Sequence, residues 1–562
     1  MKIKFPTNPT LKRLAVTRNN DILPLLMNDV DMDKVFTLLM ERCVRRGTVS
    51  MGRDKKEFDI DQDYNLETCL IPSLSTSEDF RNFDSEVARE AMLNWAKASI
   101  FNYTTVGKTK KGEQIDTMKL LSIASYRAAL PKKDNRSSAR SVDEAIYQAL
   151  FQYVGSLPGC EKPGHEIHRR VTNTSLAQGV DFDENGWPWP EPKYNNTDDV
   201  DINTLLQLRI IERFAPTKFD DRPPRKKGTT AEPLGIELMR DIARDFFAII
   251  EHFGNKSASE LLIMLRSIFA LHLYRLPIRL SRSLNEIVGN VQIEASLMFF
   301  DFTQQKNSAS VNLSKNSVAD DLAVASTLIH KQIYIGTILD FVKQKPVLLA
   351  EYLSTNEENR LNYLKEVALS EAMERHAYGL IQELIETVES CPDDAEKNEL
   401  LFHIEKASSP TNFEQLVKIV LLEVQDPGLE ALKKWLKAVA GVKNTPWSDV
   451  VSVVSGQQKS PDLWHYGMSD AVLNTLLELC FIDENGYKKI KKELSLQEVF
   501  DTFRNRWGIV INTSLPQYDS AEFDQAASEN TLAFKSRIKQ MGWFAALSDD
   551  ENAQYIAKPE GA

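Results

Sequence analysis

The sequence lacks the short motifs that mark the commonest catalytic and nucleotide-binding sites. It has no GxxxxGK[ST] loop to cradle nucleotide phosphates, and no GxGxxG pattern follows a predicted strand. A GxSxG nucleophile elbow is missing too, and no cysteine and histidine form a convincing nucleophilic pair. Because these absences leave nucleotide-dependent and nucleophilic enzymes without support, we predict a non-enzymatic protein that needs no cofactor.

Cysteine is scarce and scattered. The five cysteines are Cys43, Cys69, Cys160, Cys391 and Cys480. Their spacing excludes the CxxC motifs of zinc and redox sites, and an odd number far apart argues against a disulfide framework. This usage predicts a protein of the reducing cytoplasm.

Long apolar runs are also absent. Charges and prolines interrupt the N-terminal stretch MKIKFPTNPTLKRLAV, so it does not form a signal peptide. The most apolar segment, residues 261–276, contains Arg266 and His272 and is shorter than the ~20 apolar residues that a membrane span needs. We therefore predict a buried helix there and no contact with a membrane.

Positive charge is in deficit, since the net charge is -12. The field of the whole molecule repels phosphate. Any contact with nucleic acid must therefore come from a local basic patch.

Helical periodicity dominates the sequence and predicts a mainly α, multi-domain protein. At 562 residues the chain exceeds what one core usually supports, because domains average ~150 residues. We predict an N-terminal helical domain (1–155), an irregular loop or linker region (156–233), a central helical domain (234–455) and a C-terminal domain (456–562).

Particular residues set the predicted ends of the central helices. Gly254 is placed to cap the end of one helix, Ser257 or Ser259 to begin the next, and Pro277 to bend or stop it. Residues 295–302 and 309–313 flank the polar turn QQKNS. That pattern predicts a short β-hairpin inserted among the helices.

The last hundred residues have the order of a winged helix, a small module that docks on DNA or on another protein. Helical stretches at 469–480, 496–507 and 526–541 are joined by a turn and the apolar run 509–511. A strand, an acidic SDDE turn and a second strand then form the predicted wing. We predict a winged-helix-like module.

Basic residues in this module are the predicted nucleic-acid contacts, because lysine and arginine can neutralise phosphates. The acidic tip of the wing opposes such binding and keeps a protein partner as an equal alternative. The predicted residues are Lys488, Lys489, Lys491, Lys492, Arg504, Arg506, Lys535, Arg537 and Lys539.

Two other functional hypotheses remain open. Asp301, Thr303, Asp320 and Asp321 could form an acidic site for a divalent cation, which would make the protein a metal-dependent nuclease. The ordinary interpretation is that these acids cap a helix and a turn. Alternatively the protein is a scaffold whose Trp187 and Trp189 bind a partner, since aromatic side chains are favoured anchors.

Two weaker metal patterns favour their ordinary interpretations. The string DFDENGW at 181–187 matches the start of a calcium loop, but Pro192 stands where a bidentate glutamate is needed. Cys160, His165 and His168 offer three ligands without a fourth nearby. We predict no metal.

Three segments resemble proteins of multi-gene bacterial anti-phage systems, such as methylation-associated and phosphorothioation-linked defence operons. They are FFDFTQQKNSASVNLSKNSVADDL (299–322), LSLQEVFDTFRNRWGIVIN (494–512) and FKSRIKQMGWFAALSDDENAQYI (534–556). The resemblance covers the C-terminal half of the chain and carries over no active-site residue. It implies an accessory subunit that works beside an ATPase, nuclease or methyltransferase, and the first 230 residues have no such counterpart.

Overall fold

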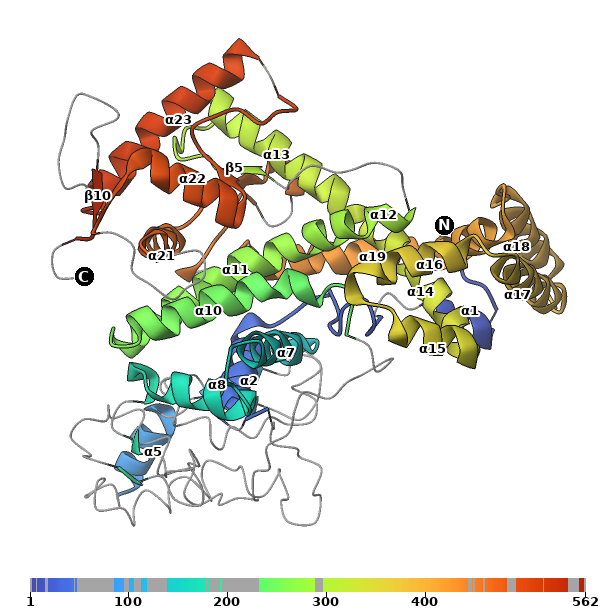
Figure 1. The fold of residues 1–562 in the computed structure, drawn as a ribbon, viewed down its shortest axis with the longest axis horizontal. Coiled ribbons are helices and arrows are strands. Elements are labelled where there is room, and N and C mark those ends of the chain that lie inside the picture. Colours follow the sequence, from blue (N-terminus) through green and yellow to red (C-terminus); the bar gives the residue numbers. More distant parts are fainter. Residues whose placement is uncertain are drawn as a thin grey trace.

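The computed structural model is mainly helical, as the sequence predicts, and its described strands are short (Figure 1). The structure describes residues 3–6, 8–15, 19–44, 46–47, 85–95, 101–105, 113–118, 139–177, 180–181, 193–194, 232–288, 297–442, 447, 450–457, 460–482, 492–518, 520–543 and 555–559.

Helices run through every part of the described chain. In order they are α1 (Pro9–Leu14), α2 (Met32–Val44), α5 (Glu86–Trp95), α7 (Val142–Gly155), α8 (Pro163–Thr172), α10 (Arg240–Phe253), α11 (Ala258–Ser283), α12 (Asn285–Val288), α13 (Ala309–Ser326), α14 (Leu328–Gln344), α15 (Pro346–Ser354), α16 (Arg360–Ala368), α17 (Glu371–Glu389), α18 (Asp394–Lys406), α19 (Asn412–Val439), α21 (Asp470–Cys480), α22 (Leu496–Trp507) and α23 (Ala521–Gln540). The short 3-10 helices are η5 (Ser175–Ala177), η7 (Ile236–Met239), η8 (Glu357–Asn359) and η9 (Pro461–Leu463).

The described strands form pairs rather than a larger sheet. They are β1 (Phe101–Thr105), β2 (Glu113–Met118), β3 (Val180–Asp181), β4 (Lys193–Tyr194), β5 (Met298–Phe299), β6 (Val454–Ser455), β7 (His465–Tyr466), β8 (Glu493–Ser495), β9 (Ile509–Val510) and β10 (Tyr555–Ala557). The pairs β1–β2, β3–β4, β6–β7 and β8–β10 are antiparallel, whereas β5–β9 is parallel.

Helix α11 is the central helix of the molecule, and it packs against α10, α13, α14, α19 and α21 (Figure 1). Ser257 begins it as predicted, because the Ser257 hydroxyl accepts from the Glu260 amide while the Glu260 carboxylate accepts from the Ser257 amide. Gly254 follows the last residue of α10, also as predicted. Local capping chemistry therefore placed this helix pair correctly.

Helix α11 continues through Pro277, so the expectation that this proline could stop the helix was wrong. Proline has no N–H and leaves the carbonyl four residues earlier, that of Leu273, without its helical donor. The indole Nε1–H of Trp435, on α19, donates to the Leu273 carbonyl oxygen at 3.2 Å. Both residues are fully buried, so a distant helix supplies the donor that the proline removes.

The predicted β-hairpin at 295–313 is wrong. Strand β5 exists but pairs with β9 from the C-terminal part of the chain, Met298 opposite Ile509. Residues 309–313 begin α13 instead. The Ser308 hydroxyl accepts from the Val311 amide at 3.1 Å, and this N-cap favours a helix where the apolar alternation indicated a strand.

Helix α8 lies inside the stretch 156–233 that was predicted to be irregular, and the prediction was wrong there. Pro163 occupies the first turn, where its missing N–H would have had no helical partner. Pro163 is therefore compatible with the start of this helix.

One hydrophobic cluster draws side chains from the N-terminal, central and C-terminal parts of the chain. Leu39 of α2, Leu150 of α7, Ile249 of α10, Leu384 of α17 and Trp507 of α22 all belong to it. Helices of the predicted domains thus share apolar packing, and the boundaries at 155, 233 and 455 stay predictions.

Two helical stretches, Ala258–Ser283 and Ala309–Gln344, are long and apolar enough to cross a membrane by composition. The apolar window of the first is 83% buried inside the protein, and that of the second is 56% buried. Burial of this kind is typical of core helices, so the fold is compatible with a soluble protein.

Candidate docking surface of the C-terminal module

The elements from α21 to β10 form the C-terminal module, shown in red in Figure 1. Serine side chains begin the three helices that the structure describes in this module. Ser469, Ser495 and Ser520 accept from backbone amides in the first turns of α21, α22 and α23. Gly508, with φ 65°, ends α22 in the left-handed conformation that glycine adopts without strain. The three predicted helices are therefore present, with α23 starting earlier than expected.

The strands of the module are arranged around these helices. Strand β10 pairs antiparallel with β8, Ile556 opposite Leu494. The Ala557 amide also donates to the Trp543 carbonyl at 2.9 Å, which brings the segment after α23 beside β10. Asn530 of α23, fully buried, donates to the carbonyls of Phe300 and Ile511 and so ties α23 to the β5 and β9 segments.

The predicted nucleic-acid residues have different environments. Lys488, Lys489 and Lys491 lie outside the described residues. Lys492, Arg504 and Lys539 are exposed, whereas Lys535 is half-buried on α23. Arg537 is half-buried and donates to the exposed carboxylate of Asp470. Among the predicted cations that the structure describes, Lys492, Arg504 and Lys539 are therefore exposed to solvent.

Arg506 lies in the protein interior, where it binds Asp245 of α10. Its Nε and Nη2 both donate to Oδ1 of Asp245, at 3.0 and 2.6 Å. Nε1 of Trp507 and Nε2 of His272 each lie 2.8 Å from the other carboxylate oxygen. The side chains of Arg506 and Asp245 are 2% and 0% exposed, so Arg506 joins α22 to α10 and does not face solvent.

The electrostatics of this cluster follow from its burial. Burial alone would raise the pKa of Asp245, but Arg506 and His272 outweigh it and hold that pKa well below its usual range. Burial lowers the pKa of His272 in spite of the carboxylate beside it. We therefore assign an ionised Asp245 that accepts from a neutral His272 with its proton on Nε2.

A second buried acid, Glu478 of α21, holds the end of the chain. Its carboxylate pairs with Lys558, just after β10, and with Lys256 at 3.3 Å. The Lys558 ammonium also lies over the ring of Phe253, 4.6 Å from the centroid. Two buried carboxylates therefore join the C-terminal module to the central helices. Asp245 of α10 binds Arg506, and Glu478 binds Lys256 in the turn after α10.

The outer face of α23 changes character along its length. Its first half exposes acids, among them Glu522, Asp524 and Glu529, and its last turn exposes Lys539. Between them Leu532 is 64% exposed. An exposed leucine between acidic and basic ends can contact a protein, whereas acids at the start of this helix oppose contact with phosphate.

The acids of the alternative nuclease hypothesis do not form a cation site. Asp301 is buried and accepts from the side chains of Thr303 and Ser310. Asp321 is buried and accepts from the Tyr466 hydroxyl at 2.7 Å. Asp320 instead accepts from the Tyr518 hydroxyl at 2.5 Å. Each carboxylate has its own protein donor, as expected for structural acids.

The described residues contain no group of three or more His, Cys, Asp or Glu that could hold a metal ion. His168 is buried, and its Nδ1 lies 2.9 Å from the Val44 carbonyl oxygen. Nε2 of His165 lies 3.0 Å from Nη1 of Arg46. Most of the calcium-like string at 181–187 lies outside the described residues, as do Trp187 and Trp189. Those two tryptophans therefore keep their predicted role as partner contacts without a structural test.

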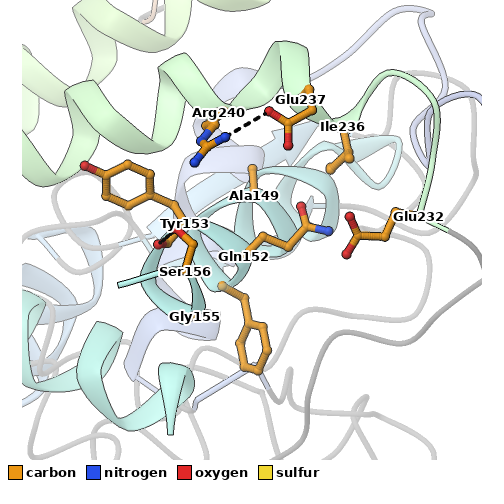
Figure 2. Close-up of a pocket in the computed structure, with 10 residues that line it drawn as sticks. Ala149, Gln152, Tyr153, Gly155, Ser156, Glu232, Ile236, Glu237 and Arg240 are labelled. Carbon is orange, nitrogen blue, oxygen red and sulfur yellow. Dashed lines mark hydrogen bonds and ion pairs between the residues drawn. The ribbon is translucent and has the colours of Figure 1, made fainter. Parts of the chain in front are cut away.

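A cavity of about 410 Å³ lies between the end of α7 and the start of α10 (Figure 2). Its charged lining residues are Glu232, Glu237 and Arg240, and Arg240 pairs with Glu237 at 3.4 Å. Figure 2 shows the side chains of Gln152 and Glu232 pointing toward each other. The cavity is lined by both polar and apolar side chains, and its arrangement does not specify a reaction.

A family model described as "Methylation-associated defense system protein MAD7" matches residues 12–559 of the chain. The chain belongs to this family. It is thus a protein of a methylation-associated defence system, which confirms the resemblance to defence-operon proteins. The match extends beyond the C-terminal half and takes in residues 12–230, a region for which the sequence suggested no counterpart. No curated protein and no solved structure matches the chain.

Membership of this family gives the candidate docking surface a context. A defence system has other components, and the C-terminal module presents an exposed face while its opposite side is fixed to the central helices. The sequence did not predict Asp245 or His272, because they lie far from Arg506 along the chain and form no local pattern. The exposed Leu532, on the polar side of a predicted helix, was a signal that the sequence did contain.

Proposed function

We propose that this protein is a non-catalytic accessory subunit of a bacterial anti-phage defence complex, and that it docks on another subunit through its C-terminal module. The observation that carries the proposal is Leu532, 64% exposed on the outer face of α23. Charged residues lie on both sides of it along the helix, which gives the apolar centre and polar rim typical of a protein interface. The partner is an ATPase, nuclease or methyltransferase that performs the chemistry in the cytoplasm.

The order and pairing of elements support a winged-helix-like module. Helix α21, strand β8, helices α22 and α23, and strand β10 follow in that order, and β10 pairs with β8. Strand β9 departs from the pattern because it pairs with β5 outside the module. In winged helices the last helix commonly supplies the contact surface, which here would be α23.

DNA is the second candidate ligand, supported by the lysine run that ends at Lys492 immediately before β8. Lys492 is exposed, and Arg504 on α22 is exposed too. In that case binding must be strongly salt-dependent, because each phosphate contact releases counterions. The alternative of a metal-dependent nuclease at 301–321 has lost its support, since Asp301 and Asp321 are buried with protein donors.

The test is binding of Leu532→Glu to each purified component of the defence system, with Ser528→Glu as the matched control. Both positions are exposed on α23 and both substitutions add one negative charge. We expect Leu532→Glu to weaken binding of one component by about tenfold or more, as at an interface hot spot, and Ser528→Glu to have a smaller effect. Equal binding of both variants and the unmodified protein would remove α23 as the docking surface.

The DNA candidate has its own test. Lys488, Lys489, Lys491 and Lys492 are changed together to alanine, and binding to duplex DNA is measured by fluorescence polarisation over a range of salt concentration. If these lysines contact phosphates, the variant binds more weakly and its affinity depends less steeply on salt. An unchanged salt dependence would eliminate this role.

A further inference from the structure

A strongly acidic helical hairpin projects at the end of the molecule opposite the C-terminal module (Figure 1). We define the acidic arm as residues 369–406, which include α17 and α18. These residues contain ten acids and three lysines or arginines, so they hold a net charge of -7 out of -12 for the chain. More than half of the net negative charge of the protein is therefore concentrated in this short segment.

The arm also exposes large apolar side chains. Leu369 is 75% exposed, Tyr378 is 54% exposed and Phe402 is 58% exposed. Since α17 and α18 run in opposite directions from their connection near residue 391, Tyr378 and Phe402 lie at about the same level along the hairpin. Two aromatic side chains in solvent at one level cost free energy unless a partner covers them.

A glycine beside Tyr378 adds an independent observation. Gly379 lies within α17, where glycine is an unfavourable residue. A Cβ placed there would have no neighbour within 4 Å, so packing inside the protein does not require glycine. A helix surface without a side chain would let another backbone approach closely at this exposed position.

Two of the acids bind residues outside the arm. Glu374 accepts from the amides at the start of α19, and Glu383 accepts from the Thr10 hydroxyl. Other acids are exposed to solvent, namely Glu386, Glu389 and Glu396. The arm therefore presents exposed carboxylates on the same hairpin as its aromatic side chains.

The salt bridges of the arm are local. Lys397 pairs with Asp394 one turn earlier on α18, and His403 lies 3.9 Å from Glu399 on the same helix. Pairs of this kind stay within the arm and leave its net charge unchanged. The excess of acids is thus available to attract a positively charged partner.

We propose that the acidic arm is a second docking site, and that its partner is a protein with a basic surface. Charge complementarity selects this partner, because the arm repels nucleic acid and anionic lipid. Tyr378 and Phe402 would supply the apolar contacts, Gly379 the close approach, and the exposed carboxylates the attraction to lysine and arginine. With one surface at each end, the protein bridges two components of its defence system, an extension that rests on the proposed docking function.

The experiment measures binding of each purified protein component of the defence system to the full-length chain at low and moderate salt. The first variant is Tyr378→Ala with Phe402→Ala, and its control is Leu463→Ala on η9, which removes an exposed leucine elsewhere. We expect the aromatic variant to weaken binding of a basic component by about tenfold or more and the control to bind normally.

Two further variants make the test independent of folding. Gly379→Gln adds a side chain into open space, so it should keep or raise the thermal stability of the protein while it weakens binding. Glu386→Lys with Glu389→Lys and Glu396→Lys should weaken binding most at low salt. Normal binding of every component by both variants would overturn the proposal.

The outcome is separable from the test of the C-terminal module. A component that no longer binds Leu532→Glu but still binds Gly379→Gln contacts α23. A component that no longer binds Gly379→Gln but still binds Leu532→Glu contacts the acidic arm. Loss of the same component in both variants would contradict a bridge between two partners.

Discussion

The C-terminal module and α18, the outer helix of the acidic arm, are held in place by different chemistry. Arg506 joins the module to α10 through a fully buried carboxylate, Asp245, which also accepts from His272. The buried residues of α18 in the arm, by contrast, are the apolar Leu400 and Ile404. A buried ion pair admits one geometry, whereas an apolar seam between two helices can open locally. We therefore expect a fixed module and, within the arm, a more adaptable α18.

The largest effect should come from breaking the buried pair. Arg506→Met leaves the carboxylate of Asp245 without its charge partner in the interior, which costs about 3–5 kcal/mol of unfolding free energy. Urea denaturation followed by circular dichroism measures the change. Arg504→Met, on the same helix but exposed, is the matched control and should change stability by less than about 0.5 kcal/mol. Equal losses in the two variants would mean that the buried pair does not fix the module.

The next effect concerns the Leu273 carbonyl of α11, which accepts from the indole of Trp435 because Pro277 has no N–H. Trp435→Phe removes the donor to the Leu273 carbonyl and should cost about 1–3 kcal/mol of unfolding free energy. Pro277→Ala restores the helical N–H, so the cost of Trp435→Phe should shrink in that background. A double-mutant cycle by chemical denaturation measures this coupling. A coupling of zero would show that the indole does not replace the missing helical donor.

These two sites show what the sequence could and could not predict. The serine cap at Ser257 is local, and it marked the start of α11 correctly. Arg506 was interpreted as a surface cation because its partner lies 261 positions away. Pro277 was predicted to bend or stop its helix. The sequence did not reveal the compensating donor, the indole of Trp435, because that residue lies on a distant helix, α19. In both cases a polar partner far away in the sequence determined the structure, and such a partner leaves no local sequence pattern.

The failed hairpin has a different cause. Residues 309–313 alternate in a way that suits a strand, yet the Ser308 cap and continued helical spacing favour α13. The apolar stretch before it is a strand whose partner, β9, comes from the C-terminal part of the chain. In the candidate site, the three helices of the module were predictable. The surface of the arm was not recognised, because exposure depends on how α17 and α18 pack.

Acid should weaken the fixed module through His272. Burial lowers the pKa of His272, so the folded protein keeps this ring neutral while the unfolded chain binds a proton as the pH falls through about 6.5. The contribution of His272 to stability is therefore present above that pH and is lost below it. Denaturation midpoints measured at several pH values should fall less steeply with acid in His272→Gln. If the midpoints of the unmodified protein and of His272→Gln fell equally with acid, His272 would not be the source of the acid sensitivity.

The smallest predicted effect belongs to the arm. Gly379→Ala replaces an unfavourable helical residue at a position with open space, and it should stabilise α17 by about 0.5–1 kcal/mol. Hydrogen exchange of α17 amides should slow, while exchange in α22 should not change. Faster exchange in α17 would show that the glycine has a packing role within the protein.

The most direct test of the account compares the two ends in one experiment. The full-length chain is co-expressed with the other components of its defence system, and the components that co-purify with Leu532→Glu and with Gly379→Gln are identified. The account predicts that each variant loses a different component while the rest stay bound. Retention of every component by both variants would contradict an accessory subunit that acts by docking through its two ends.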